Sequence, residues 1–376
     1  MTVLLLLIVI WKSIDFIVSL AAPVFIPYLG FFSYGSDMLT YNVPDFVRAL
    51  SNFDGIFYTR IATQGYSYTE QAFFPLYPLL IRSMNGFIGN PLYSGILISH
   101  LAGTAALFVF YKYLKMLYPK QNPIWILLFL IAYPTSYYLG VMYNESVFFL
   151  LFISTLYAYK KEHYAAAGVL GYLTALTRVI GVFVAIPIGF LLLQKYLSER
   201  KVSLSFTVLL MPLLGLGSYC AYLWKTVGDP FFFIHAQESF GAHRSSQLIT
   251  PLQVLYRYLK IFVTADHNFQ FYVAALEVSF FIIVTGILVY DLVKILKEKS
   301  LNFDRLGLNI FSFANILIPT LTGTFTSIPR YSLMSLSIFC VLGNITNIYL
   351  RYTILAVCII LHICLLALFI QGYYVT

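Results

Sequence analysis

The segment NFDGIFYTRIATQGYSYTEQAFFPLYP, residues 52–78, carries the acidic side chain that comes first among the candidates for catalysis. From Phe53 to Gln64 the apolar residues recur at helical spacing, and Asp54 lies at the edge of their shared face. A carboxylate that faces a cavity could take a proton from a substrate hydroxyl. Asp is also a common N-cap of helices, so position alone leaves a catalytic and a capping role of Asp54 open.

Two arginines stand beside breaks in apolar runs. Arg178 lies in LTRVIG, between two short runs, and Arg330 lies in TSIPRYSL, next to a proline. A single arginine near a membrane surface usually anchors a helix by extending its guanidinium toward water. With no acidic neighbour in sequence, these two also suit a phosphate group. We expect Arg330 and Arg178 to bind a lipid phosphate, which is the obvious candidate for that location.

Glu145 opens an apolar run in YNESVFFLL. A carboxylate at a helix N-terminus is stabilised by the helix dipole, so a capping role is one explanation for it. The depth of Glu145 and the adjacent Asn144 also suit a sugar-binding rim. The residues that we expect to bind substrate are Glu70, Asn144, Glu145, His235, Gln237 and Tyr331.

A metal site could be assembled on paper in the segment GDPFFFIHAQESFGAHRSSQLITP and just beyond it. The possible ligands are Asp229, His235, Glu238, His243, Asp266 and His267. Their spacing matches no zinc pattern, and no Asp-x-Asp pair occurs in the chain. We therefore expect no metal and no other cofactor.

The composition excludes a soluble protein. Of the 376 residues, 60% are hydrophobic and only 10% are charged, and the mean hydropathy is +0.83. Soluble domains carry about 25% charged residues. The net charge of +8 does not indicate nucleic-acid binding, because the basic residues form short clusters between apolar runs and no contiguous patch.

The apolar runs predict an all-α polytopic membrane protein that forms one domain over residues 1–376. About eleven runs approach the length of roughly 20 residues that a bilayer core requires. They centre near Ile14, Ala105, Ile131, Phe152, Tyr172, Ile188, Leu213, Ile282, Leu317, Phe339 and Leu361. The runs near Tyr172 and Ile188 are short and closely joined, so either could be a broken helix.

The distribution of basic residues predicts a cytoplasmic N-terminus. Lysine and arginine gather in the even-numbered gaps between spans, as the positive-inside rule requires of cytoplasmic loops. They are Lys112, Lys115, Lys120, Lys160, Lys161, Lys195, Arg200, Lys201, Lys294, Lys297, Lys299, Arg305 and Arg351. The two long loops, at about residues 27–90 and 225–270, would then lie on the non-cytoplasmic side.

The first long loop is expected to form helices on the membrane surface. It then turns back at AFFPLYPLL, where Pro75 and Pro78 argue against a regular helix. Irregular backbone at membrane depth is tolerated only where it lines a cavity in protein. This loop is therefore predicted to wall a cavity at the outer membrane face.

Taken together, these segments resemble the GPI mannosyltransferase 2 (PIG-V) family, in the form of its prokaryotic relatives. FDGIFYTRIATQGYSYTEQAFFPLYP looks like the first luminal loop of that family, with an aromatic-Asp pair, a Gly-Tyr and an AFFPxxP run. YNESVFF, LTRVIGVFVAIP, GDPFFFIHAQ and PRYSL follow in the expected order. The resemblance covers nearly the whole chain. The family usually has Trp before the aspartate, where this chain has Phe53.

The resemblance implies a GT-C-type membrane glycosyltransferase fold. Such enzymes take a sugar, for this family typically mannose, from a polyprenyl-phosphate donor and act on the non-cytoplasmic side. By similarity, Asp54 matches the catalytic acidic residue of the first loop, and it would act as the general base. The expected reaction is inverting and metal-independent, and its acceptor would be a hydroxyl of a lipid or glycan in a bacterial or archaeal cell membrane.

Two other functions remain open from the sequence. A transporter or lipid flippase would share the composition and the arginines, although it should show internal repeats or matched intramembrane charges in two halves. The intramembrane charges that stand out are Lys12 and Asp15, which are spaced to pair on one helical face. A transferase for another sugar would look the same, because sugar choice depends on a few hydroxyl contacts.

Overall fold

The computed structural model describes residues 2–29, 35–119, 122–200, 204–240, 244–245 and 247–375, and these residues form helices and loops without a strand. Lys120, Lys201 and His243 lie outside them. The α-helices are α1 (Thr2–Phe25), α2 (Asp45–Ala49), α3 (Asp54–Gln64), α4 (Leu76–Ile88), α5 (Pro91–Leu117), α6 (Ile124–Ile131), α7 (Glu145–Lys160), α8 (Tyr164–Ala175), α9 (Ala185–Glu199), α10 (Thr207–Val227), α11 (Phe232–His235), α12 (Pro251–Thr264), α13 (Phe269–Leu296), α14 (Phe303–Thr320), α15 (Ile328–Ser332), α16 (Ser337–Gly343) and α17 (Ile348–Ile370). The 3₁₀ helices are η1 (Gly35–Tyr41), η2 (Glu70–Ala72), η3 (Ser136–Leu139), η4 (Val179–Val184), η5 (Leu204–Phe206) and η6 (Ala236–Phe240).

Six helical segments of the described chain are long and apolar enough to cross a membrane, so the all-α prediction is confirmed and the chain is an integral membrane protein. Each has 21 to 28 residues, the length that a bilayer core requires. They are Thr2–Phe25, Pro91–Leu117, Val179–Glu199, Thr207–Val227, Phe269–Leu296 and Ile348–Ile370.

The other predicted span centres fall on shorter or more polar helices, so the number eleven stays a prediction. For example, α6 has 8 residues, α8 has 12 and α16 has 7. Between α6 and α7, residues 132–144 leave the α-helical path, yet every one of them is buried. This irregular backbone can exist inside a membrane protein because the surrounding protein covers it and satisfies its polar groups.

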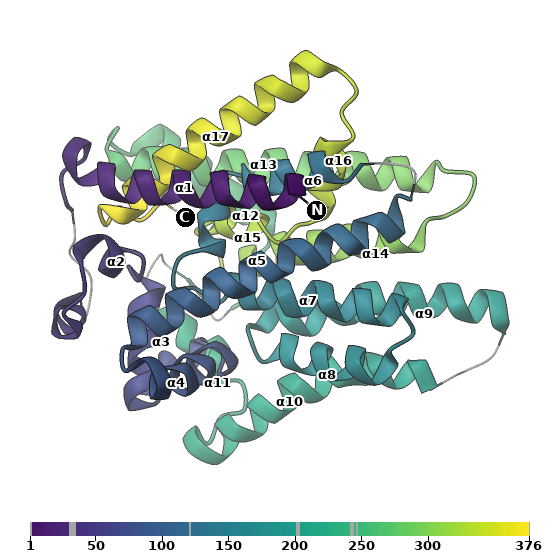
Figure 1. Ribbon diagram of the computed structural model, residues 1–376, viewed down its shortest axis with the longest axis horizontal. Coiled ribbons are helices and arrows are strands. Elements are labelled where there is room, and N and C mark those ends of the chain that lie inside the picture. Colours follow the sequence, from purple (N-terminus) through teal and green to yellow (C-terminus); the bar gives the residue numbers. More distant parts are fainter. Residues whose placement is uncertain are drawn as a thin grey trace.

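The long helices pack as neighbours in a bundle. Helix α7 contacts α5 and α8, α8 contacts α10, and α9 contacts α14, while α1 and α17 lie side by side (Figure 1). The amino end of α7 carries Glu145, and its 16 residues extend about 24 Å to Lys160. There, Lys160 binds Asp304 of α14 at 2.9 Å. The lysine-rich ends and the candidate catalytic residues therefore lie at opposite ends of α7.

The first long loop is mostly helical in its described part. Helices α3 and α4 contact each other, and η2, which lies between them in the sequence, contacts α11 (Figure 1). The prediction that Pro78 prevents a regular helix is wrong: α4 begins at Leu76, after Pro75, and continues to Ile88. Pro78 is the third residue of α4, where a backbone N–H would have no intrahelical partner, so its missing donor costs nothing there.

Candidate active site

A cavity of about 1650 Å³ lies among the two long loops and the loop before α15. Ordinary ligand pockets measure about 300–1,000 Å³, so this cavity has room for more than one substrate group. Its charged lining residues are Asp54, Glu145, Arg178, Arg244, Arg257, Lys260, Glu277 and Arg330. The sequence singled out nine residues as base, phosphate-binding or substrate-binding groups. Seven of them line the cavity: Asp54, Asn144, Glu145, Arg178, Gln237, Arg330 and Tyr331.

Asp54 is the first residue of α3, and its side chain faces an arginine instead of capping the helix. The N-cap position is held by Phe53, which makes no side-chain cap and has φ 60°. This left-handed conformation is strained for a bulky residue and costs on the order of 1–3 kcal/mol. The backbone N–H of Asp54 donates to the Tyr143 hydroxyl at 3.2 Å, and that hydroxyl donates to the carbonyl of Asn52 at 3.1 Å. These contacts hold Asp54 at the cavity wall.

Arg330 joins the two carboxylates of the site. Its Nη1 donates to Asp54 Oδ2 at 2.6 Å, and its Nε lies 3.5 Å from Glu145 Oε1. Only 6% of Arg330 is exposed. Burial disfavours its charged form, but the carboxylates of Asp54 and Glu145 outweigh burial and hold the pKa of Arg330 well above its usual value. The arginine therefore stays charged next to Asp54.

Glu145 is shared between both predicted phosphate-binding arginines. Arg178 Nη1 donates to Glu145 Oε1 at 3.1 Å, the same oxygen that faces Arg330. Glu145 is 1% exposed, and no described residue donates a hydrogen bond to its Oε2. Asn144 braces this cluster, because its Nδ2 donates to the carbonyl of Thr177 at 2.7 Å and ties the start of α7 to the residue before Arg178.

The four charged residues Asp54, Arg330, Glu145 and Arg178 form a connected, electrically balanced group, which we call the inner cluster. Tyr331 lies between its arginines, with its ring centre 5.3 Å from the guanidinium of Arg178 and 5.2 Å from that of Arg330. Burial raises the pKa of the Tyr331 hydroxyl, but the surrounding arginines outweigh burial and leave it below its ordinary value. The inner cluster thus places two carboxylates and two cations next to the Tyr331 side chain.

Two of the predicted substrate residues lie away from the cavity lining. Glu70 is 3% exposed, accepts a hydrogen bond from the Ser67 backbone and lies 3.7 Å from Arg60, so it stabilises the first loop. The ring of His235 is bonded to Asp229 at 2.6 Å and is largely exposed. Gln237 does line the cavity, where its Oε1 accepts from Arg244. Among the described residues, no group of three or more His, Cys, Asp or Glu side chains is placed to hold a metal ion.

The sequence analysis missed part of the lining. Arg244, Arg257 and Lys260 line the cavity together with Glu277 and Tyr374. A signal for Arg257 and Lys260 was present: they fall on one side of residues 251–264, where apolar residues recur at helical spacing on the other side. Nothing local indicates Tyr374, which reaches the cavity from beyond the last span and bonds to Ser327 at 2.8 Å.

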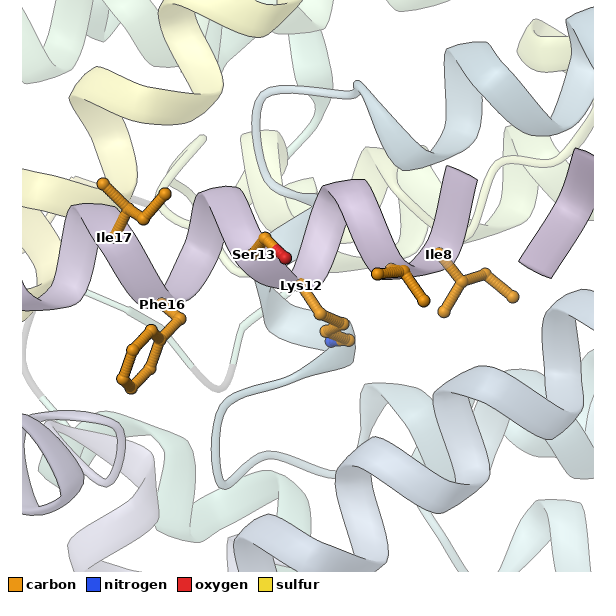
Figure 2. A pocket seen from close by; sticks show the side chains of 6 residues that line it. Ile8, Lys12, Ser13, Phe16 and Ile17 are labelled. Atoms are coloured by element: carbon orange, nitrogen blue, oxygen red, sulfur yellow. The ribbon is translucent and has the colours of Figure 1, made fainter. Parts of the chain in front are cut away.

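A second, smaller hollow runs along α1 and contains the intramembrane lysine. It measures about 520 Å³, and Figure 2 shows Lys12 extending from α1 beside Ser13 and Phe16. The predicted pair exists, with Lys12 Nζ 3.9 Å from Asp15 Oδ2. Asp15 also bonds to His362 of α17 at 2.8 Å, so this charge group joins the first and last spans.

No family model and no curated protein matches this sequence. Among solved structures, the chain is similar to ArnT from Cupriavidus metallidurans, in a crystal structure bound to undecaprenyl phosphate. The two are 14% identical, with a TM-score of 0.49, over 93% of this chain and 62% of that chain. This chain therefore matches less than two thirds of ArnT's length. At a TM-score below 0.5, nothing about this chain's chemistry follows from the likeness.

Proposed function

We propose that this protein is a membrane glycosyltransferase of the GT-C type, related to the GPI mannosyltransferase 2 (PIG-V) family. Its donor would be a polyprenyl-phosphate-linked sugar, with mannose as the sugar, and its acceptor would be a hydroxyl of a lipid or glycan on the non-cytoplasmic side. The first-loop motif around Asp54, which resembles that family, supports the choice of reaction.

The observation that carries this proposal is the environment of Asp54. One oxygen of its carboxylate, Oδ2, is held by Arg330, while Oδ1 accepts no hydrogen bond from a described residue and the side chain is 26% exposed in the cavity. A general base needs this combination of a fixed orientation and a free lone pair within reach of the substrate. The cavity is also large enough for a sugar and an acceptor together.

In the proposed reaction, Asp54 Oδ1 takes the proton of the acceptor hydroxyl as its oxygen attacks the anomeric carbon. The bond from that carbon to the phosphate oxygen breaks on the opposite face, its electron pair leaves with the polyprenyl phosphate, and the configuration inverts. Arg330 and Arg178 add positive potential as negative charge develops on the departing phosphate. Glu145 contacts both arginines through Oε1 and so keeps these cations in place.

The test uses purified protein in nanodiscs with radiolabelled polyprenyl-phosphate-mannose and a lipid extract of the source membrane. Wild type should release polyprenyl phosphate and move the label to a new lipid or glycan. Asp54→Asn should lower turnover about 10²–10⁴-fold, the usual contribution of a general base, while donor binding stays nearly unchanged. Near wild-type turnover of Asp54→Asn would exclude the proposed base. Donor translocation without sugar transfer would favour the flippase instead.

A further inference from the structure

Helix α12 has two chemically different faces. On one side, Leu252, Tyr256, Leu259 and Val263 follow helical spacing and are 60% to 85% exposed. On the other side, Arg257 and Lys260 line the cavity. An amphipathic helix with an exposed apolar stripe is typical of a segment that lies in the membrane interface. Helix α12 therefore separates surrounding lipid from the cationic part of the cavity.

Arg257 is held in place by a glycine. Its Nη1 donates to the carbonyl of Gly323 at 3.0 Å. Gly323 has φ +96°, and a Cβ built there would lie 2.7 Å from Arg257 Nη1. A side chain at position 323 would thus be strained and would displace the guanidinium. The contact uses one N–H of Arg257 and leaves the others free to face a ligand in the cavity.

Arg244 lines the same cavity, close enough to the inner cluster to interact with its charges. Its Nη1 donates to Gln237 Oε1 at 2.8 Å. Burial lowers the pKa of Arg244, but Tyr331, Tyr374 and Asp54 lie near enough to raise it overall. In contrast to Arg330 and Arg178, the cavity residues Arg244, Arg257 and Lys260 form no ion pair with an Asp or Glu side chain of the described chain. We call these three residues the outer cations.

The two parts of the cavity differ in charge balance. Each arginine of the inner cluster already faces a carboxylate, so an added anion there would compete with Asp54 and Glu145. The outer cations form no ion pair with a carboxylate of the described chain, although Asp54 and Glu277 lie near enough to Arg244 to interact with its charge. Arg257 and Lys260 belong to the amphipathic helix α12. Arginine offers several N–H donors in a geometry that matches phosphate oxygens, and lysine adds a point charge.

We propose that Arg244, Arg257 and Lys260 bind the phosphate of the lipid-linked donor, and that α12 borders the path of its polyprenyl chain. The identity of the donor rests on the proposed function. Transfer of the sugar converts a phosphodiester with one negative charge into a monoester with about −1.5 to −2 at pH 7. The outer cations therefore bind the departing phosphate more strongly than the donor's phosphate, which favours the transition state. In this assignment, Arg330 and Arg178 do not bind the phosphate of the donor. They stabilise only the negative charge that develops on the phosphate during the reaction.

Binding of polyprenyl phosphate, without sugar or acceptor, tests this assignment. Wild-type protein and variants in neutral phosphatidylcholine nanodiscs are titrated with radiolabelled polyprenyl phosphate, and neutral polyprenol serves as the uncharged ligand. Arg244→Gln and Arg257→Gln should each weaken binding roughly tenfold or more, the loss expected for a hydrogen bond to a charged group. The control is Lys225→Gln, which removes an exposed charge near the end of α10. Its affinity for polyprenyl phosphate should stay within about twofold of wild type. Arg257→Lys should recover part of the binding, which a folding defect would not allow.

Three results would overturn the assignment. Wild-type affinity in both Arg244→Gln and Arg257→Gln would exclude these side chains as phosphate ligands. An equally large loss in Arg178→Gln would place the phosphate at the inner cluster. Displacement of polyprenyl phosphate by an equal concentration of phosphatidic acid would show that the site takes ordinary phospholipid headgroups. Because no sugar is present, this binding result stands apart from failure of the transfer assay.

Discussion

At the scale of single residues, Arg330 fixes the orientation of the Asp54 carboxylate and balances its charge. A buried arginine that bridges two carboxylates is costly to remove, because its partners are left charged and uncompensated. Arg330→Met should lower the free energy of unfolding by on the order of 3 kcal/mol. Chemical denaturation of the purified protein would measure this loss.

The control for that variant is the exposed ion pair of α2. Arg48 binds Asp45, whose side chain is 88% exposed, and such surface pairs contribute about 0–1 kcal/mol. Arg48→Met should therefore change the stability by less than about 1 kcal/mol. Equal losses in Arg330→Met and Arg48→Met would mean that the contact between Arg330 and Asp54 contributes little.

The sequence indicated several residues of the candidate site, but it did not predict which of them pair with each other. Local features singled out the four members of the inner cluster, Asp54, Glu145, Arg178 and Arg330. These features were a helix start, an interruption between two apolar runs, or a neighbouring proline. Their mutual contacts were not predictable, because Asp54 and Arg330 are 276 positions apart. The contacts of Glu70 were not predictable from the sequence either: it accepts a hydrogen bond from the Ser67 backbone and lies 3.7 Å from Arg60.

At the scale of elements, η4 positions Arg178 through a close packing contact. A Cβ on Gly181 would lie 2.1 Å from the carbonyl oxygen of Thr174 in α8, so η4 or α8 would have to move. A displacement of about 1 Å at a catalytic group can cost on the order of 10²-fold in rate. Gly181→Ala should therefore reduce both sugar transfer and the thermal unfolding midpoint.

Gly286 provides the matched control. It lies inside α13, and a Cβ there meets nothing within 4 Å. Because Gly is less favourable than Ala in a helix interior by about 0.5–1 kcal/mol, Gly286→Ala should be neutral or slightly stabilising. If Gly181→Ala also left stability and transfer unchanged, the contact between η4 and α8 would not position Arg178.

The positions of helices were predictable where a long apolar run was uninterrupted and not elsewhere. Helices α1, α5, α13 and α17 match runs that the sequence marks clearly. Between α6 and α7 the same apolar composition leaves the α-helical path, because distant segments satisfy its polar groups: Thr135 Oγ1, for instance, donates to the carbonyl of Pro329 at 2.8 Å. Such tertiary compensation leaves no periodic signal in the sequence.

At the scale of the whole molecule, the positions of basic residues predict which end of the bundle faces the cytoplasm. In a variant without the four free cysteines, Leu248→Cys and Lys299→Cys can be tested with a membrane-impermeant maleimide on intact cells. Leu248 is 84% exposed in the second long loop and should react from outside. Lys299, which follows α13, should react only after the membrane is opened. The opposite labelling pattern would mean that the cavity faces the cytoplasm.

The link between Asn52 and α17 has a consequence for how the protein is made. The Asn52 side chain donates to the carbonyl of Phe369, 317 positions later, and the ring of Phe53 packs against that of Phe369. The strained turn that presents Asp54 is thus supported by a segment that is synthesised 317 positions later. During synthesis, the turn at Phe53 therefore stays without this support until the chain has been extended by more than 300 further residues and α17 has been inserted.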